Sequence, residues 1–108
     1  MRTNVNQKNN AGKTPLHIAV SKFDHYCDVD SHIKFIRFLL NSGANVTEKD
    51  NAGNTALHYA QNTNCAELLI KNGAKIFIKN DKRKTPFAMV KSGDMKEFYK
   101  LRNFPQFF

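Results

Sequence analysis

Metal-binding side chains are concentrated in one stretch of this 108-residue chain. Carboxylate, imidazole and thiol groups gather at Asp24, His25, Cys27, Asp28, Asp30 and His32. A structural zinc site would need two short-spaced ligand pairs such as Cys-x-x-Cys, and the stretch contains none. A calcium loop would need glycine at its sixth position and glutamate at its twelfth, and both are missing. We therefore expect an acidic surface loop over Phe23–Asp30 that leads into a helix capped by Asp30 or Ser31, with no metal and no cofactor.

Acid–base catalysis is the other chemistry that the four histidines suggest. His17 and His58 occur in the same short phrase, which indicates a repeated structural role. His25 and His32 lie beside no nucleophile and no glycine-rich element. We predict no catalytic residues and no enzymatic activity.

The formal net charge of +8 is concentrated in the second half of the chain. Residues 1–65 hold 7 Lys or Arg against 5 Asp or Glu, whereas residues 66–108 hold 10 against 4. Such a field speeds association with an acidic partner and makes it salt-dependent. The plainest interpretation is a solvated surface. The functional alternatives are contact with an acidic protein and an anion or nucleic-acid site at Lys82-Arg83-Lys84, although no aromatic residues are interleaved with that triplet.

One phrase recurs along the chain. Residues 10–19 (NAGKTPLHIA) return as 51–60 (NAGNTALHYA) and, in weaker form, as 81–90 (DKRKTPFAMV). A second element, LLNSGANV at 39–46 and LIKNGAKI at 69–76, precedes the later two phrases. A unit this short cannot bury its own hydrophobic face, so neighbouring units must stack. The sequence therefore predicts a repeat array, and its function is expected to be recognition.

Each phrase also contains the signals that start a helix. The hydroxyl of Thr14 can accept a hydrogen bond from the His17 backbone, and Pro15 fits the first helical position. The imidazole of His17 can reach back to the cap backbone as the glutamate of a capping box does. In the second phrase, Thr55 and His58 occupy the same places. Positive-φ turns are expected at Gly12 and Gly53 before the caps, and at Gly43 and Gly73 after the second helices.

With these features the chain resembles the ankyrin repeat family, whose unit of about 33 residues has a turn, two helices and the phrase Thr-Pro-Leu-His-x-Ala. The resemblance implies an all-α solenoid of helix-turn-helix units joined by β-hairpin-like loops, in a single domain over 1–108. We place the units at about 9–47, 50–77 and 80–102, after a closing arm of a preceding repeat at 1–8 and before an aromatic tail at 103–108. The chain then starts in mid-repeat, as a piece of a longer array would.

The three units depart from the family pattern in different ways. Thr14 and Thr55 are 41 residues apart and Thr55 and Thr85 are 30 apart, so the first unit carries an insertion and the second a deletion. Arg83 and Ala88 replace the expected glycine and histidine of the third unit. This predicts a poorly formed last loop, in keeping with a terminal repeat.

The spacing of apolar residues predicts six helices, at about 15–22, 31–41, 56–61, 65–71, 86–91 and 95–102. The inward residues are expected to be Ile33, Phe35, Ile36, Leu39 and Leu40 in the second helix, and Phe98 and Leu101 in the last. Pro105 cannot continue the last helix. Three alternatives stay open for Phe104, Phe107 and Phe108: they cover the last repeat, bind a partner or stay exposed.

The resemblance implies that the chain binds another protein through a concave face of loop tips and first helices, as part of an adaptor, inhibitor or scaffold. Matched position by position, the contact residues are Asn10, Ala11, Lys13, Asn51, Ala52, Asn54, Tyr59, Gln61, Asp81, Lys82 and Lys84. The insertion and the composition rich in Lys, Asn, Ile and Phe also resemble ankyrin proteins of large DNA viruses and intracellular bacteria, which target host factors.

The remaining sequence features concern the compartment. Cys27 and Cys65 lack motif spacing, and we expect reduced, partly buried thiols. No apolar run approaches the roughly 18 residues of a membrane span, and Met1–Asn6 lacks the apolar stretch of a signal peptide. We expect a monomeric protein of the cytoplasm, or of a host cytoplasm.

Overall fold

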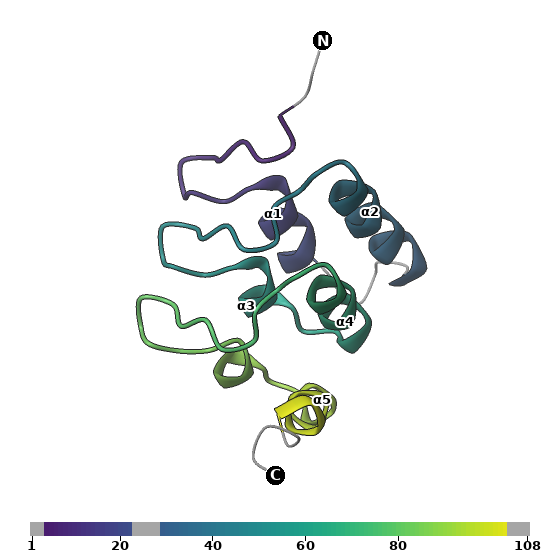
Figure 1. Cartoon of the computed structure of the whole chain (residues 1–108), viewed down its shortest axis with the longest axis vertical. Helices are drawn as coiled ribbons and strands as arrows, with labels where there is room; N and C mark the ends of the chain where they lie inside the picture. The colour runs from purple at the N-terminus through teal and green to yellow at the C-terminus, as the bar shows by residue number, and fades with distance from the viewer. Residues whose placement is uncertain (1–3, 23–28, 104–108) are drawn as a thin grey trace.

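A computed structural model describes residues 4–22 and 29–103 of the chain (Figure 1). The described residues form helices and loops and contain no strand. The helices are α1 (Pro15–Ser21), α2 (Val29–Asn41), α3 (Ala56–Tyr59), α4 (Thr63–Lys71), the 3-10 helix η1 (Phe87–Met89) and α5 (Gly93–Asn103). The predicted all-α helix-turn-helix stack is confirmed.

The units stack side by side in three layers (Figure 1). The loops lie on one side, the first helices α1, α3 and η1 in the middle, and the second helices α2, α4 and α5 on the other side. Each first helix contacts the next one, and each second helix does the same. The resulting stack is elongated, with extents of 50 × 31 × 23 Å.

Side-chain caps start α1 and α3 where the sequence predicts, whereas α2 and α4 each begin two residues before the predicted starts at 31 and 65. Asp30 and Ser31 lie inside α2, so the prediction that one of them caps it is wrong. Thr14 caps α1 through a capping box with His17, and Thr55 and His58 form the same box at α3. Asn62 caps α4 by accepting from the Cys65 backbone at 3.1 Å. Because that cap lies only seven residues after Thr55, α3 has room for a single turn and ends at Tyr59, before the predicted end at residue 61.

The third unit has the same limited space between its caps. The Ser92 hydroxyl accepts from the Met95 backbone at 3.1 Å, again seven residues after Thr85. The predicted helix at 86–91 is therefore reduced to the short 3-10 helix Phe87–Met89. The last helix begins at Gly93, two residues before the prediction.

The core runs through the stack between first and second helices. Its fully buried side chains include Leu16, Ile36, Leu57, Leu69 and Tyr99. Leu16 and Leu57 occupy equivalent places in their units, as do Leu69 and Tyr99, so the core is one continuous column rather than a central cluster. Stability of such a column is a sum of contacts between neighbours.

Two inward predictions are wrong. Phe35 is 52% exposed and Leu101 is 64% exposed. In α5 the buried residues are Met95 and Tyr99, one turn apart, and Leu101 lies two positions from Tyr99, on the opposite side of the helix. In α2 apolar residues occur on nearly every side, and the stack buries the side that carries Ile36 and Leu39.

Several predicted features lie outside the described residues. These are most of the insertion, with Cys27, and the tail residues Phe104, Phe107 and Phe108. Within the described ranges, no helix is both long and apolar enough to cross a bilayer. Among those same residues, no group of three metal-binding side chains comes together.

Candidate protein-binding face

One side chain at the start of each loop closes that loop. The carboxylate oxygen Oδ1 of Asp50 accepts from the N–H groups of Ala52 and Asn54, both at 2.9 Å. The side-chain oxygens of Asn9 and Asn80 accept from the equivalent pairs of N–H groups in their own loops. These three residues were not predicted from the sequence, although an Asn or Asp at the same place before each phrase is a recognisable turn signal.

The three loops are joined to each other through their backbones. The N–H of Asn51 donates to the carbonyl of Ala11 at 3.0 Å, and the N–H of Asp81 donates to the carbonyl of Ala52 at 3.0 Å. The Asn51 amide also donates to the Asn10 carbonyl at 3.0 Å. The loops therefore form a ladder with one backbone bond per step.

The two motif histidines brace this ladder from inside. Nδ1 of each imidazole accepts from the N–H of its own cap residue, Thr14 or Thr55. Nε2 lies 2.8 Å from the Asn54 carbonyl in His17 and 2.9 Å from the Lys84 carbonyl in His58. Because a carbonyl only accepts, Nε2 must carry the proton. Each histidine thus fixes its own helix start to the following loop, and the predicted structural role is confirmed.

Burial shifts the titration of His58. The side chain is enclosed between its cap and the third loop, and this burial lowers the pKa of His58 below its ordinary value, although the bond to the Lys84 carbonyl opposes the shift. The neutral form required by the bonding pattern is therefore the form that the site favours.

Glycine is needed in the loops for two separate reasons. Gly12, Gly53, Gly43 and Gly73 all have positive φ, as predicted. A Cβ on Gly53 would also lie 2.8 Å from the Asp81 backbone nitrogen, and one on Gly12 would lie 2.8 Å from that of Asn51. Gly12 and Gly53 thus allow the next loop to approach.

The third loop is well formed, so the prediction of a poor last loop is wrong. Its backbone bonds from Asn80 to Lys84 and from Arg83 to Asn80, both 2.9 Å, match those of the second loop. Arg83 takes the left-handed conformation at φ 62°. An arginine fits here because no further loop of the described chain stacks on this one.

A polar cluster lies behind the loops at Tyr59. The Tyr59 hydroxyl donates to Oδ2 of Asp50 and accepts from the Asn54 amide at 3.1 Å. Burial alone would raise the pKa of Asp50, but the bonds from Tyr59 and from the loop N–H groups outweigh it and hold that pKa below its usual value. Burial and the bond to Asp50 raise the pKa of Tyr59. The Lys13 ammonium lies 5.0 Å from the centre of the Tyr59 ring, which makes a cation–aromatic pair at the half-buried floor of the face.

The structure sorts the predicted contact residues into three groups. Eight are exposed, namely Asn10, Ala11, Asn51, Ala52, Gln61, Asp81, Lys82 and Lys84, whereas Lys13 and Tyr59 are half-buried. Asn54 is only 7% exposed. Its side chain binds Tyr59 and also accepts from the Asn80 amide at 2.8 Å, so it is a spacer between loops and is removed from the contact set.

Gln61 has a structural task that the sequence analysis did not foresee. Its amide nitrogen donates to the Met89 carbonyl, and its amide oxygen accepts from the Lys91 N–H, both at 3.2 Å. The side chain therefore ties the second unit to the third. The contact residues that remain are gathered on what we call the loop face, formed by residues 10–13, 51–52 and 81–84 with Tyr59.

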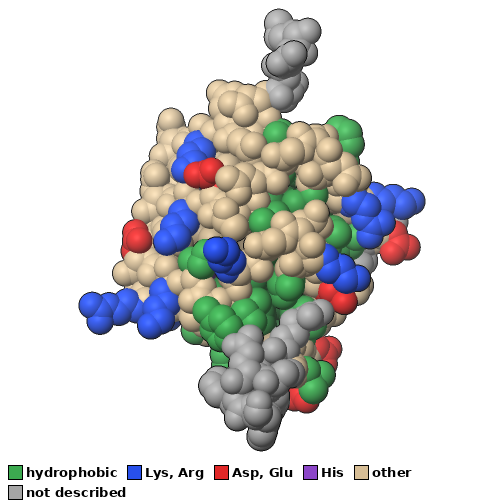
Figure 2. Space-filling model, in the orientation of Figure 1, with side chains coloured by type: hydrophobic (Ala, Val, Ile, Leu, Met, Phe, Trp, Pro, Cys, Tyr) green, Lys and Arg blue, Asp and Glu red, His purple; other side chains and the backbone are tan. Residues whose placement is uncertain are grey.

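Positive charge gathers on the loop side of the molecule (Figure 2), where Lys and Arg side chains are more numerous than acidic ones. The Lys8 ammonium is paired with the Glu48 carboxylate at 2.9 Å. Within the part of the chain that the structure describes, Lys82, Arg83 and Lys84 have no ion-pair partner. Their charge is available to a ligand.

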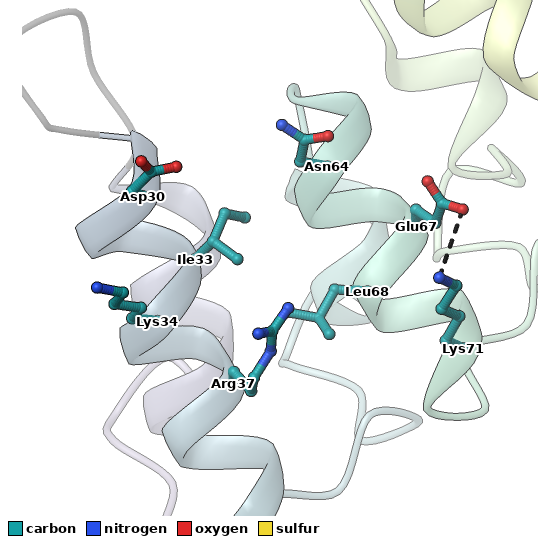
Figure 3. A pocket seen from close by; sticks show the side chains of 8 residues that line it. All are labelled: Asp30, Ile33, Lys34, Arg37, Asn64, Glu67, Leu68 and Lys71. Atoms are coloured by element: carbon teal, nitrogen blue, oxygen red, sulfur yellow. Dashed lines mark ion pairs between the residues drawn. The ribbon is translucent and has the colours of Figure 1, made fainter.

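A groove of about 360 Å³ lies on the opposite side, between α2 and α4 (Figure 3). It is lined by Asp30, Ile33, Lys34, Arg37, Asn64, Glu67, Leu68 and Lys71. Glu67 and Lys71 form an ion pair at 3.7 Å across one helical turn. Charges of both signs share this open groove, so it has no clear preference for an anion or a cation.

The arrangement of loops, capped helices and bracing histidines agrees with a comparison of the sequence with known families. A family model described as ankyrin repeats (3 copies) matches residues 1–80. The chain belongs to the ankyrin repeat family. The third ankyrin loop extends beyond the matched residues and keeps the same geometry. No curated protein matches the chain.

Membership of the ankyrin repeat family sets the general class of function. Ankyrin repeats are protein–protein interaction modules, bind other proteins and are typically not enzymes. In the described ankyrin residues, both motif histidines are engaged in loop bracing.

Proposed function

We propose that this chain binds an acidic segment of another protein through the loop face. The observation that carries the proposal is the Lys82-Arg83-Lys84 triplet, for which the described residues provide no ion-pair partner. It lies on a ladder in which Asp50 is turned inward to Tyr59, so Asp81 is the acidic residue left exposed beside the three cations. A carboxylate-rich partner would meet cations at the rim, where no carboxylate of the described residues pairs with them.

The floor of the face adds a second kind of contact. Lys13 and Tyr59 present an ammonium above an aromatic ring, with the tyrosine fixed by Asp50 and Asn54. A fixed aromatic side chain loses little conformational entropy when it binds, and tyrosine is enriched at the centres of protein interfaces. We expect partner affinity to depend on Tyr59 and association rate to depend on the lysines.

The remaining elements of the proposal follow from this mode of binding. A module that contributes one rigid face and no catalysis acts as an adaptor, an inhibitor or a scaffold. We place it as a monomer in the cytoplasm, or in a host cytoplasm if it targets host factors. These are proposals that rest on the family resemblance and on the charge of the loop face.

A charge-reversal capture experiment tests the proposal. The variant Lys82→Glu/Lys84→Glu and the control Lys34→Glu/Lys96→Glu have the same net charge. The control changes exposed residues of α2 and α5, helices that lie on the side of the stack away from the loops. We expect proteins captured from lysate by the wild type to be retained by the control and lost with the loop variant. Equal capture by both variants would rule out the loop face.

A titration with duplex DNA separates the alternative of nucleic-acid binding. Phosphate contacts would make affinity fall steeply as salt rises. We expect binding to the duplex at physiological salt to be no tighter than nonspecific. A tight, salt-sensitive complex that requires Lys82 and Lys84 would replace the acidic protein with nucleic acid as the ligand.

A further inference from the structure

Two large apolar side chains are exposed on the second helix of the first unit. Phe35 is 52% exposed and Phe38 is 62% exposed. The later units have apolar residues at the same places, 30 and 60 positions further along. They are Cys65 and Met95 in register with Phe35, and Leu68 and Phe98 in register with Phe38. Cys65 and Met95 are each 1% exposed, and the other two are half-buried. Among the three described second helices, only α2 exposes the residues at both of these places.

The stack shows what covers the pair in the later units. Leu68 of α4 faces Ile33 and Arg37 of α2 across the groove, with Arg37 extended toward it (Figure 3). Leu68, the residue in register with Phe38, thus faces the second helix of the preceding unit. In α2, Phe35 lies two positions from both Ile33 and Arg37, about 200° around the helix, and therefore points away from α4. In Figure 1, α2 stands at the end of the stack nearest the N-terminus, with no described helix beyond it.

The loop of the first unit has an unused bonding position on the same end. The N–H groups of Asn51 and Asp81 each donate to a carbonyl of the preceding loop. Asn10 occupies the same position in its loop and is exposed, and within residues 4–22 and 29–103 its N–H has no partner. The N–H of Asn10 therefore occupies the position from which Asn51 and Asp81 donate to the preceding loop. It lies at the same end of the stack as the exposed pair Phe35 and Phe38.

We propose that this end surface, formed by Phe35, Phe38 and the edge of the loop at Asn10, binds a further ankyrin-type unit. The second helix of that unit covers the two phenylalanines, and its loop offers a carbonyl to the Asn10 N–H. Its histidine donates to the Lys13 carbonyl, which is equivalent to the Asn54 and Lys84 carbonyls that His17 and His58 bind.

The opposite end of the described stack cannot supply such a loop to a second copy. Arg83 carries a side chain where Gly12 and Gly53 leave room for the next loop, and Ala88 replaces the bracing histidine. Head-to-tail assembly of this chain is therefore not the way in which the surface is covered. The partner unit must have glycine and histidine at these two places.

Adding such a unit to the full chain tests the proposal. A copy of residues 50–74 is fused directly before Asn4. Because Asn4 aligns with Lys75, residues 4–8 then follow the copy as residues 75–79 follow residue 74 in the second unit, and they serve as the closing arm of the added unit. We expect the midpoint of thermal unfolding, followed by circular dichroism, to rise by on the order of 10 °C. In the double variant Phe35→Ser/Phe38→Ser, most of this rise on adding the unit should be lost. In the chain without the added unit, the same two substitutions should change the midpoint by about 2 °C or less.

Two controls make the result decisive. In the added copy, Gly53→Arg should remove part of the rise, because it reproduces the blocked loop of the third unit. An unchanged midpoint, or a rise that persists without the phenylalanines, would overturn the proposal.

Sedimentation of the unextended chain at about 100 μM should show a monomer. A dimer that depends on Phe35 and Phe38 would also overturn it, since the surface would then bind a second copy. The two proposals share the loop at residues 10–13, but the unfolding midpoint reports stacking on Phe35 and Phe38, whereas the capture experiment reports Lys82 and Lys84, so either can fail alone.

Discussion

Substitution of a single loop glycine should reveal how much the ladder contributes to stability. In Gly53→Ala the new methyl group meets the Asp81 backbone nitrogen at 2.8 Å, so the third loop must move away. Gly43 is the matched control, because it also has positive φ but a Cβ there would meet nothing within 4 Å. Alanine in the left-handed region costs about 1–2 kcal/mol at either site.

The additional cost at Gly53 comes from the bonds that the displaced loop would lose. The Asp81 N–H bond to Ala52 and the His58 bond to Lys84 each contribute about 1 kcal/mol. We therefore expect Gly53→Ala to lower the free energy of unfolding by about 3–4 kcal/mol, against about 1–2 kcal/mol for Gly43→Ala. The Asp81→Ala background should give only partial rescue, since it removes the contact with Asp81 Oδ1 at 2.5 Å but leaves the contact with the backbone nitrogen at 2.8 Å.

Urea unfolding followed by circular dichroism measures both changes. A difference of about 2 kcal/mol between the variants moves the midpoint by roughly 1 M at the slopes usual for small proteins. If backbone strain were the whole cause, Gly43→Ala would be at least as damaging, since its φ of 97° lies further from the left-handed minimum than the 79° of Gly53. Equal midpoints, or a lower midpoint for Gly43→Ala, would refute the account of the ladder.

Three further predictions concern strain, protonation and packing. Arg83→Gly should raise the free energy of unfolding by about 0.5–1 kcal/mol, measured by urea unfolding, because glycine removes the left-handed penalty; a loss would show that the arginine side chain stabilises the loop. The folded pKa of His58 lies below the unfolded value, so the unfolded chain binds more protons and stability should fall as pH drops below about 6.5. Thermal unfolding across pH 7.5 to 5.5 checks this, and the slope should be smaller in His58→Gln. Tyr99→Ala should cost about 3–5 kcal/mol and Leu101→Ala less than about 0.5 kcal/mol, the reverse of what a buried Leu101 would give.

The local parts of the fold could be predicted because they depend on residues a few positions apart. The box of Thr14 and His17 spans three residues, and the positive φ of Gly12 is a property of one. Such signals are complete within the phrase itself. The starts of α1 and α3 were therefore predicted to the residue.

The choice of buried helix face could not be predicted, because the neighbouring helix decides it. Helix α2 has apolar residues on nearly every side, and the stack leaves Phe35 outside while Ile36 is fully buried. In α5, Tyr99 replaces Leu101 as the inward residue, packing edge-on against Phe87 of η1 with ring centres 6.0 Å apart. Both outcomes depend on contacts with other helices, which the pattern within one helix does not contain.

The contact residues show the same limit. Asn54 and Gln61 occupy positions that the family resemblance assigns to binding, yet each is held by partners from the next unit. Arg83 was expected to spoil its loop, but the loop tolerates a left-handed arginine where no further loop stacks. Polar side chains at repeat junctions can therefore be assigned to structure or to binding only when both units are seen together.

Site-specific photo-crosslinking tests the central claim most directly. A photoreactive side chain is placed at position 84 on the loop face and, in a second protein, at position 34 on α2, both of which are exposed. Irradiation in lysate should give a discrete adduct with the same partner protein from position 84 at physiological salt, reduced by Tyr59→Ala, and none from position 34. Adducts of equal yield from both positions, or from position 34 alone, would contradict the claim that the loop face binds the partner.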